Sequence, residues 1–234
     1  MPDARPPLFL IAGGRDSLRK RGPDPLISGA LALAGVPRPQ VAYLGVASGD
    51  NAAFRVLIGA MLKKAGAGKV TAAPLCGKRA DPEEARKVLS ESHLVFVSGG
   101  DVEEGMRVLK ETRMVRFLRS LHASGKPFLG VSAGSIMLAR TWVRWPDPDN
   151  EQSAELFPCL GFAPVLCDTH GEADGWEELK ALLALSPVGT VGYGIVSGSA
   201  LVAGPGGKVK AMGGDVHRFR RKATGVMQIE SLAD

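Results

Sequence analysis

A serine between two glycines is the clearest candidate for chemistry in this sequence. The motif Gly130-Val131-Ser132-Ala133-Gly134 stands between an apolar run at 128–131 and a helix-like segment at 136–140. A sharp strand-to-helix turn, which small residues permit, would present the Ser132 hydroxyl as a nucleophile at the end of the strand. The backbone N–H of Ala133 would face the same space and could stabilise an oxyanion. The alternative is a turn rich in small residues without chemistry.

A serine nucleophile needs a base, and the sequence contains four histidines. His170 stands where an apolar run ends, which is where an open α/β sheet presents catalytic side chains. A solvated loop histidine is the alternative. We expect structural or surface roles for the other three, which are His93, His122 and His217.

A third group should hold the imidazole in its catalytic tautomer. The polar, proline-rich segment 145–151 is expected to be a loop, and it offers Asp147, Asp149 and Glu151. Any one acid in such a loop could equally be a solvated surface residue.

A glycine turn lies upstream of the serine. The apolar run at 94–97 continues into Ser98-Gly99-Gly100-Asp101. A glycine N–H at this point could supply a second oxyanion donor. Asp101, followed three residues later by Glu104, forms a pattern like a capping box at the start of a helix. An ordinary turn with a helix N-cap is the alternative.

The segments that must position these residues alternate between strand-like and helix-like. Continuous apolar runs, typical of parallel strands buried on both faces, occur at 8–12, 41–46, 70–75, 94–97 and 128–131. Helical spacing falls between them at 52–65, 82–89 and 106–122. Short β-like runs at 190–195, 200–202 and 209–212 predict antiparallel strands at one side of the same sheet. We therefore expect one α/β domain over residues 1–234.

Composition excludes several classes of protein. The 234 residues are 45% hydrophobic and 23% charged, which is ordinary globular usage. The three cysteines are widely separated, and we expect buried thiols rather than a disulfide framework or a zinc ribbon. Gly13-Gly14 is not followed by a dinucleotide fingerprint, and no cluster has metal-ligand spacing. We expect neither a cofactor nor a metal.

Charge and hydropathy indicate the environment. The net charge is +5, and one dense basic cluster occurs at 218–222. A solvated surface explains this cluster as well as phosphate binding does, so nucleic acid is the weaker alternative as a partner. No apolar run approaches the roughly 18 residues that span a bilayer, and the first residues lack the basic region of a signal peptide. We expect a cytoplasmic protein without membrane association.

Together, the Gly99-Gly100 turn, the serine motif, a loop acid and Asp168-Thr169-His170 resemble the S51 serine peptidases, the family of dipeptidase E and cyanophycinase. The resemblance extends from Leu8 to about Met212. It implies the class I glutamine-amidotransferase-like fold, a three-layer αβα sandwich with a mostly parallel sheet. By position it implies that Ser132 is the nucleophile and His170 the base, with Asp147 as the triad acid. It also implies an oxyanion hole formed by Gly100 and Ala133.

Two segments depart from this family pattern. After the histidine, where many members have an Arg-rich helix start, the segment 171–179 contains Glu172, Asp174, Glu177 and Glu178 and no arginine. Where many members have an acid in a Gly-Ile-x-Glu-Gly segment, this sequence has Ser197. A pocket edged by the downstream acids should repel an aspartyl side chain and favour a basic or neutral residue or a free α-amine, unless Arg140 or Arg144 turns inward.

The resemblance implies a serine peptidase that acts on short peptides through an acyl-enzyme. A catalytically silent binding or scaffold protein with the same fold is the main alternative. An α/β-hydrolase esterase is disfavoured, because few residues separate Ser132 from His170 and they leave little room for the intervening strands of that fold. The oligomeric state is open, with a homodimer as one option.

Overall fold

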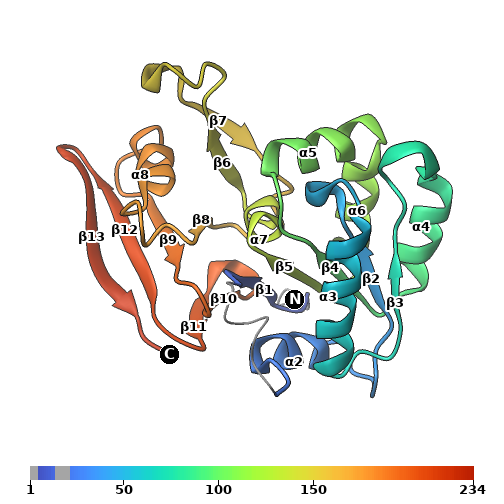
Figure 1. Ribbon diagram of the computed structural model, residues 1–234. Coiled ribbons are helices and arrows are strands. Elements are labelled where there is room, and N and C mark those ends of the chain that lie inside the picture. Colours follow the sequence, from blue (N-terminus) through green and yellow to red (C-terminus); the bar gives the residue numbers. More distant parts are fainter. Residues whose placement is uncertain (1–4, 14–21) are drawn as a thin grey trace.

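The main sheet of the protein is mostly parallel (Figure 1). A computed structural model describes residues 5–13 and 22–234; Gly14 of the glycine pair therefore lies outside the described residues. Within that part, the sheet has the order β11-β10-β1-β5-β4-β2-β3. Its parallel strands are β1 (Leu8–Ile11), β5 (Phe128–Val131), β4 (Leu94–Val97), β2 (Val41–Leu44) and β3 (Val70–Ala72). Antiparallel strands β10 (Ala200–Ala203) and β11 (Val209–Met212) extend the edge beside β1, as predicted.

Alternate side chains of the parallel strands pack against two opposite layers of helices. In β1, Leu8 and Leu10 share a core with α4 (Pro82–Glu91), α5 (Val102–Glu111), α6 (Met114–Ala123) and α7 (Ala133–Leu138). Phe9 and Ile11 share a second core with α2 (Pro25–Ala32) and α3 (Ala52–Lys64). A strand buried on both faces needs apolar residues at every position. The parallel sheet buried on both faces that the continuous apolar runs predict, and the three-layer αβα sandwich that the family resemblance implies, are thereby confirmed.

A second sheet stands beside the first, on the left in Figure 1. It has the order β13-β12-β9-β8 and contains β8 (Leu166–Thr169), β9 (Val191–Ile195), β12 (Val216–Lys222) and β13 (Gly225–Leu232). The run at 190–195 was expected in the main sheet, but β9 pairs with β8 and β12 instead. A short apolar run shows that a strand forms and does not specify its partner. The basic cluster at 218–222 belongs to β12.

A hairpin and a helix complete this side of the molecule. Strands β6 (Thr141–Arg144) and β7 (Glu155–Pro158) pair antiparallel, and the predicted loop at 145–151 lies at the tip of this hairpin. Helix α8 (Glu177–Ala184) packs against β6, β8 and β9.

Polar caps fix where the helices begin. Asp81 accepts hydrogen bonds from the backbone N–H groups of Glu83 and Glu84, with Pro82 at the first helical position, as predicted. The stretch at 106–122 forms two helices, α5 and α6, which meet at Arg113 in the left-handed conformation.

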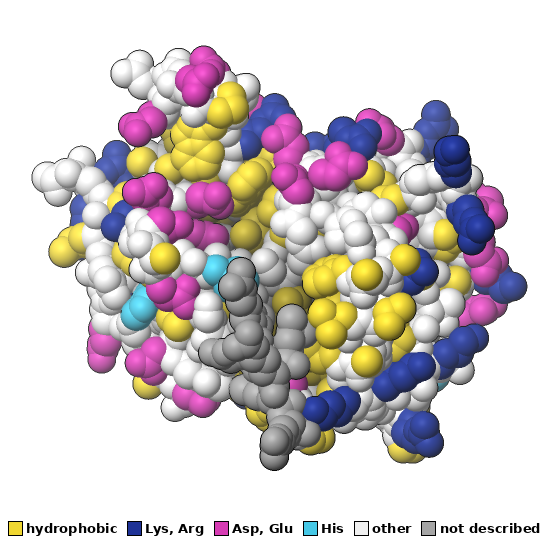
Figure 2. Space-filling model, in the orientation of Figure 1, with side chains coloured by type: hydrophobic (Ala, Val, Ile, Leu, Met, Phe, Trp, Pro, Cys, Tyr) yellow, Lys and Arg dark blue, Asp and Glu magenta, His cyan; other side chains and the backbone are white. Residues whose placement is uncertain are grey.

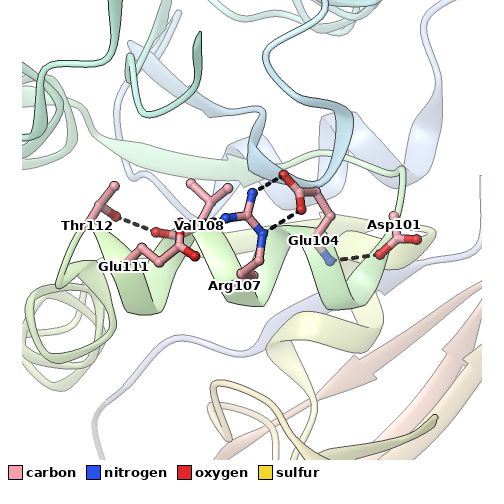
Figure 3. Close-up of polar contacts among 6 residues, drawn as sticks. All are labelled: Asp101, Glu104, Arg107, Val108, Glu111 and Thr112. Atoms are coloured by element: carbon pink, nitrogen blue, oxygen red, sulfur yellow. Dashed lines mark hydrogen bonds and ion pairs between the residues drawn. The ribbon is translucent and has the colours of Figure 1, made fainter. Parts of the chain in front are cut away.

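Helix α5 begins beside the glycine turn and is fixed there by Asp101 (Figure 3). The Asp101 carboxylate accepts the backbone N–H of Glu104 at 2.8 Å, which is half of the expected capping box. The Glu104 carboxylate does not return to the cap; it pairs with Arg107 at 2.7 Å, and Arg107 also reaches Glu111 at 2.5 Å. The Asp101 cap holds the first turn of α5, and with it the end of the glycine turn, whereas the Arg107 pairs lie along the exposed face of the helix.

The three cysteines are free, and burial raises the pKa of each thiol, for Cys76 and Cys159 to about 12. They are therefore protonated, unreactive side chains. No helix among the described residues is long and apolar enough to cross a membrane.

Candidate active site

Ser132 follows β5 directly and has a backbone conformation that most residues avoid. Its φ is 53° and its ψ is −125°. Its N–H donates to the Ile11 carbonyl at 2.9 Å, and its own carbonyl accepts the N–H of Ser135 at 2.8 Å. Gly134 passes so close to β4 that a Cβ there would lie 2.1 Å from the Val97 oxygen. The chain thus turns from strand to helix within one residue and presents Ser132 at the carboxyl end of β5.

Two backbone N–H groups border this serine. Gly100 has a φ of 142°, and a Cβ there would lie 1.9 Å from the Ala47 carbonyl oxygen, so the turn after β4 requires glycine. The N–H of Asp101 donates to the same oxygen at 2.8 Å and fixes the turn. The Gly100 N–H has no partner among the described residues. Ala133 opens α7, where an N–H has no intrahelical partner.

His170 is placed by the second sheet. It follows β8, and β8 runs parallel to β9 with Thr169 opposite Ile195, so the residues after the two strands meet at one edge. There the His170 Nδ1 lies 3.2 Å from the Ser197 Oγ. The link between Ser197 and His170 therefore comes from strand pairing over long sequence separation.

Hydrogen bonds tie this edge to the main sheet. The N–H of Gly198 donates to the Gly13 carbonyl at 2.8 Å, and the N–H of Ala12 donates to the Ser199 carbonyl at 3.0 Å. Because β1 neighbours β5, these bonds bring the β9–β10 turn beside the serine. Ser132 and His170 consequently line the same two cavities.

The structure does not bring Asp147 to His170. Asp147 is exposed at the tip of the β6–β7 hairpin, where its Oδ1 accepts the N–H of Asp149 at 3.2 Å. Asp149 and Glu151 are exposed on the same tip. Within the described residues, none of these acids hydrogen-bonds to His170 or lines a cavity with it. Asp147 has the ordinary role of a loop acid, whose side chain stabilises a turn by accepting a nearby backbone N–H.

Ser197 and Glu172 stand next to the imidazole instead. The Glu172 Oε1 accepts the Ser197 backbone N–H at 2.5 Å. Burial acts to raise the pKa of Glu172, but hydrogen bonds from the backbone and hydroxyl of Ser197 and the charge of His170 lower it overall. Burial lowers the pKa of His170, and the Glu172 charge and a hydrogen bond to the backbone of Ala12 oppose that change. The sequence signal for Ser197 was its place in the segment where S51 peptidases often carry an acid.

The two cavities that meet at Ser132 and His170 differ in character. One has a volume of about 470 Å³ and is largely apolar, with walls from α2, α3 and β5. The other has a volume of about 330 Å³ and is lined by four carboxylates, those of Asp101, Asp168, Asp174 and Glu178. Lys and Arg are absent from the described lining of both.

Arg140 and Arg144, which could have offset the negative charge of the acidic cavity, do not line it. Arg140 is exposed, and Arg144 pairs with Glu103 and Glu155 at 2.6 Å each. Of the downstream acids, Asp174 and Glu178 reach the acidic cavity, whereas Glu177 is exposed and outside its lining.

The other histidines lie outside both cavities. His93 accepts the backbone N–H of Gln40, buried His122 stacks on Phe162, and His217 lies against Ser231.

Comparisons with known proteins agree with this architecture. The model for peptidase family S51 matches residues 8–209. A crystal structure of a peptidase from an acI-B1 Actinobacterium aligns with a TM-score of 0.73 at 18% identity, covering 98% of this chain and 97% of that one. A provisionally assigned peptidase E from Listeria monocytogenes EGD-e aligns with a TM-score of 0.56 at 16% identity, covering 89% and 98%. At these identities the structural likeness shows the fold alone. No curated protein has a significantly similar sequence.

Proposed function

Because the chain belongs to peptidase family S51, we propose that it is a serine peptidase of dipeptidase type, with Ser132 as nucleophile and His170 as general base. The observation that carries this proposal is the strained conformation of Ser132 on the wall of two cavities that it shares with His170. A strained residue persists where the surrounding structure enforces it, and catalytic sites are where such strain is used.

The proposed reaction follows from the groups around the serine. The Ser132 Oγ forms a bond to the peptide carbonyl carbon while its proton passes to the His170 ring nitrogen that faces away from Ser197. The N–H groups of Gly100 and Ala133 donate to the resulting oxyanion. The C–N bond then breaks, and the leaving amine takes the proton from His170. Water hydrolyses the acyl-enzyme by the same steps, and Ser132 regains its proton.

We assign the orienting role to Ser197 and Glu172. Glu172 accepts the Ser197 backbone N–H, and a hydrogen bond from the Ser197 hydroxyl also lowers the pKa of this carboxylate. A hydroxyl that donates to Glu172 keeps a lone pair for the N–H at His170 Nδ1, which is the tautomer that a general base requires. Ser197 thus does for the imidazole what a triad acid does directly, with Glu172 behind it.

We expect Ser197→Ala to lower kcat by roughly 10- to 100-fold, less than the loss of about 10,000-fold that follows when a triad histidine loses its tautomer control.

Glu172→Gln should move the acid limb of the kcat/KM profile to lower pH. Activity requires neutral His170 and is lost as pH falls through its pKa, and removing a negative charge that raises this pKa lowers it further. Steady-state kinetics from pH 4 to 9 would measure both effects.

The chain offers a matched control for Ser197. Ser231 faces the Nδ1 of His217 at the same 3.2 Å, and neither residue lines either cavity, so Ser231→Ala should leave kcat unchanged. Asp147→Asn should keep full activity. If Asp147→Asn were inactive and Ser197→Ala fully active, the orienting role would return to the hairpin acid.

A series of peptides of increasing length tests the dipeptidase assignment. We expect free amino acids to be released from dipeptides with a higher kcat/KM than from hexapeptides, because the two cavities that meet at the serine have volumes of only about 470 and 330 Å³. Ser132→Ala provides the background rate. Faster cleavage at internal bonds of hexapeptides would contradict the assignment, and no hydrolysis of any peptide would favour a silent scaffold.

A further inference from the structure

We propose that the substrate is a short peptide with a cationic group on one side of the scissile bond and a bulky apolar side chain on the other. This inference rests on the proposed hydrolysis and names the substrate class. It follows from the opposite chemistry of the two cavities that meet at Ser132 and His170.

The larger cavity is suited to an apolar side chain. Helix α3 contributes Phe54, Ile58 and Met61 to its wall, α2 contributes Ile27 and β5 contributes Val131. Figure 2 shows hydrophobic side chains gathered over α3. Binding of an apolar substrate group against this surface is favourable, because it removes the apolar surface of both the group and the cavity from water. A side chain of leucine or phenylalanine type would do this.

One carboxylate lines the apolar cavity, and the fold accounts for it. Asp24 caps α2, and its Oδ1 accepts the N–H groups of Leu26 and Ile27 at 2.9 and 3.3 Å. Asp24 is the single acidic side chain in the described lining of this cavity, against four in the smaller cavity. The rest of the described lining is apolar or small apart from the catalytic edge formed by Ser132, His170 and Ser197.

The smaller cavity carries uncompensated negative charge. The partners of its carboxylates are neutral: the Trp142 indole N–H donates to Glu178 at 2.9 Å, and backbone N–H groups donate to Asp168, Asp174 and Asp101. None of the four forms an ion pair within the described residues. Figure 2 shows acidic side chains gathered near α8, away from the hydrophobic surface of α3.

This charge stands directly beside the reacting groups. Asp168 immediately precedes Thr169 and His170 and is 5% exposed. Burial, with the charge of Glu178, raises the pKa of Asp168 to about 7, so near neutral pH it carries only part of a negative charge. The remaining negative charge in this cavity is that of Asp101, Asp174 and Glu178. Ser132 lines the same cavity. A substrate carboxylate would be repelled there, whereas an ammonium or guanidinium group would be attracted. The cation could be a lysine or arginine side chain or the free α-ammonium of the peptide.

A panel of dipeptides assayed with the wild-type protein would test the inference. It contains Lys-Leu, Gln-Leu and Glu-Leu, the same pairs in reversed order, Lys-Gly and Gly-Lys, and N-acetylated copies of all. One order of the two residues, Lys-Leu or Leu-Lys, should be hydrolysed faster. In that order, we expect kcat/KM to fall about 10- to 100-fold when leucine is replaced by glycine. We expect a fall of at least about 10-fold when the cation is removed, either by lysine to glutamine or by N-acetylation. Which of these two changes costs activity identifies the side chain or the α-ammonium as the cation.

Two variants connect each preference to its cavity. Glu178→Gln can still accept the Trp142 N–H and should weaken the preference for the cation, whereas Glu177→Gln, on the same helix but outside the cavity, should not. Met61→Gln should weaken the preference for leucine over glycine, and Leu57→Gln, on the exposed face of the same helix, should not.

The possible failures are distinguishable. Hydrolysis that shows no preference for the cation, or no preference for the bulky apolar side chain, would overturn this inference. So would a preference for Glu-Leu or Leu-Glu. Each of these results would leave the peptidase assignment standing. Absence of hydrolysis across the whole panel would overturn both.

Discussion

Replacement of Ser132 by alanine is expected to lower kcat by about 10,000- to 1,000,000-fold, to the level that remains when a serine triad is disabled. His170→Ala should cost about as much, and the double variant should lose little more, because nucleophile and base act as one unit. Hydrolysis of the best dipeptide, followed by mass spectrometry, would measure these rates. Ser124→Ala, at an exposed site near the end of α6, serves as the control.

The same position gives a second readout that does not depend on knowing the substrate. At φ 53° and ψ −125°, Ser132 carries strain that glycine would relieve. Ser132→Gly should therefore be inactive and yet exceed Ser132→Ala in free energy of unfolding by about 1 kcal/mol. Residual activity above about 1% of wild type in either variant would contradict the nucleophile assignment, since such a loss is far smaller than a missing nucleophile causes.

Of the substitutions that add a single methyl group near the site, Gly100→Ala is expected to lower stability and activity the most. The added Cβ would lie 1.9 Å from the Ala47 oxygen, at a φ that alanine avoids, so the turn after β4 must move. We expect a loss of at least about 3 kcal/mol in free energy of unfolding. A displaced Gly100 N–H would also remove one of the two proposed oxyanion donors, which costs about 100- to 1,000-fold in kcat in the folded fraction.

Gly77→Ala separates the clash from the ordinary cost of a left-handed backbone. Gly77 has a φ of +70° and nothing within 4 Å of an added Cβ, so its replacement should cost only about 1 kcal/mol. Urea denaturation of the two variants would make the comparison. A Gly100→Ala protein as stable and as active as Gly77→Ala would exclude the proposed role of the turn.

Local features of the site were predictable from sequence because their causes are local. A strand, a small-residue turn and a helix are consecutive at Ser132, and the glycines permit the start of α7 to lie close to β4 and β5. The same holds for the turn at Gly100, where Asp101 caps the following helix. Continuous apolar runs also predicted the parallel sheet, since alternate residues must face both helix layers.

Features that depend on pairing between distant strands were not predictable in this way. Ser197 reaches His170 because β8 and β9 pair in a second sheet, and a short β-like run does not specify that partner. The family resemblance implied Asp147 by its position after Ser132, but the loop lies at the tip of a β-hairpin, away from the imidazole, and its acids are exposed. Likewise, α2 was not predicted, and with it part of the apolar cavity wall was missed.

The central claim is that Ser132 is an activated nucleophile, and reaction with a fluorophosphonate followed by peptide mass mapping tests it most directly. Such a reagent reacts with serines whose hydroxyl is activated by a neighbouring base and stabilised by oxyanion donors. The account predicts a single adduct on Ser132, absent in His170→Ala and slower to form in Ser197→Ala. An unlabelled Ser132 in the folded wild-type protein, or equal labelling of Ser132 with and without His170, would contradict it.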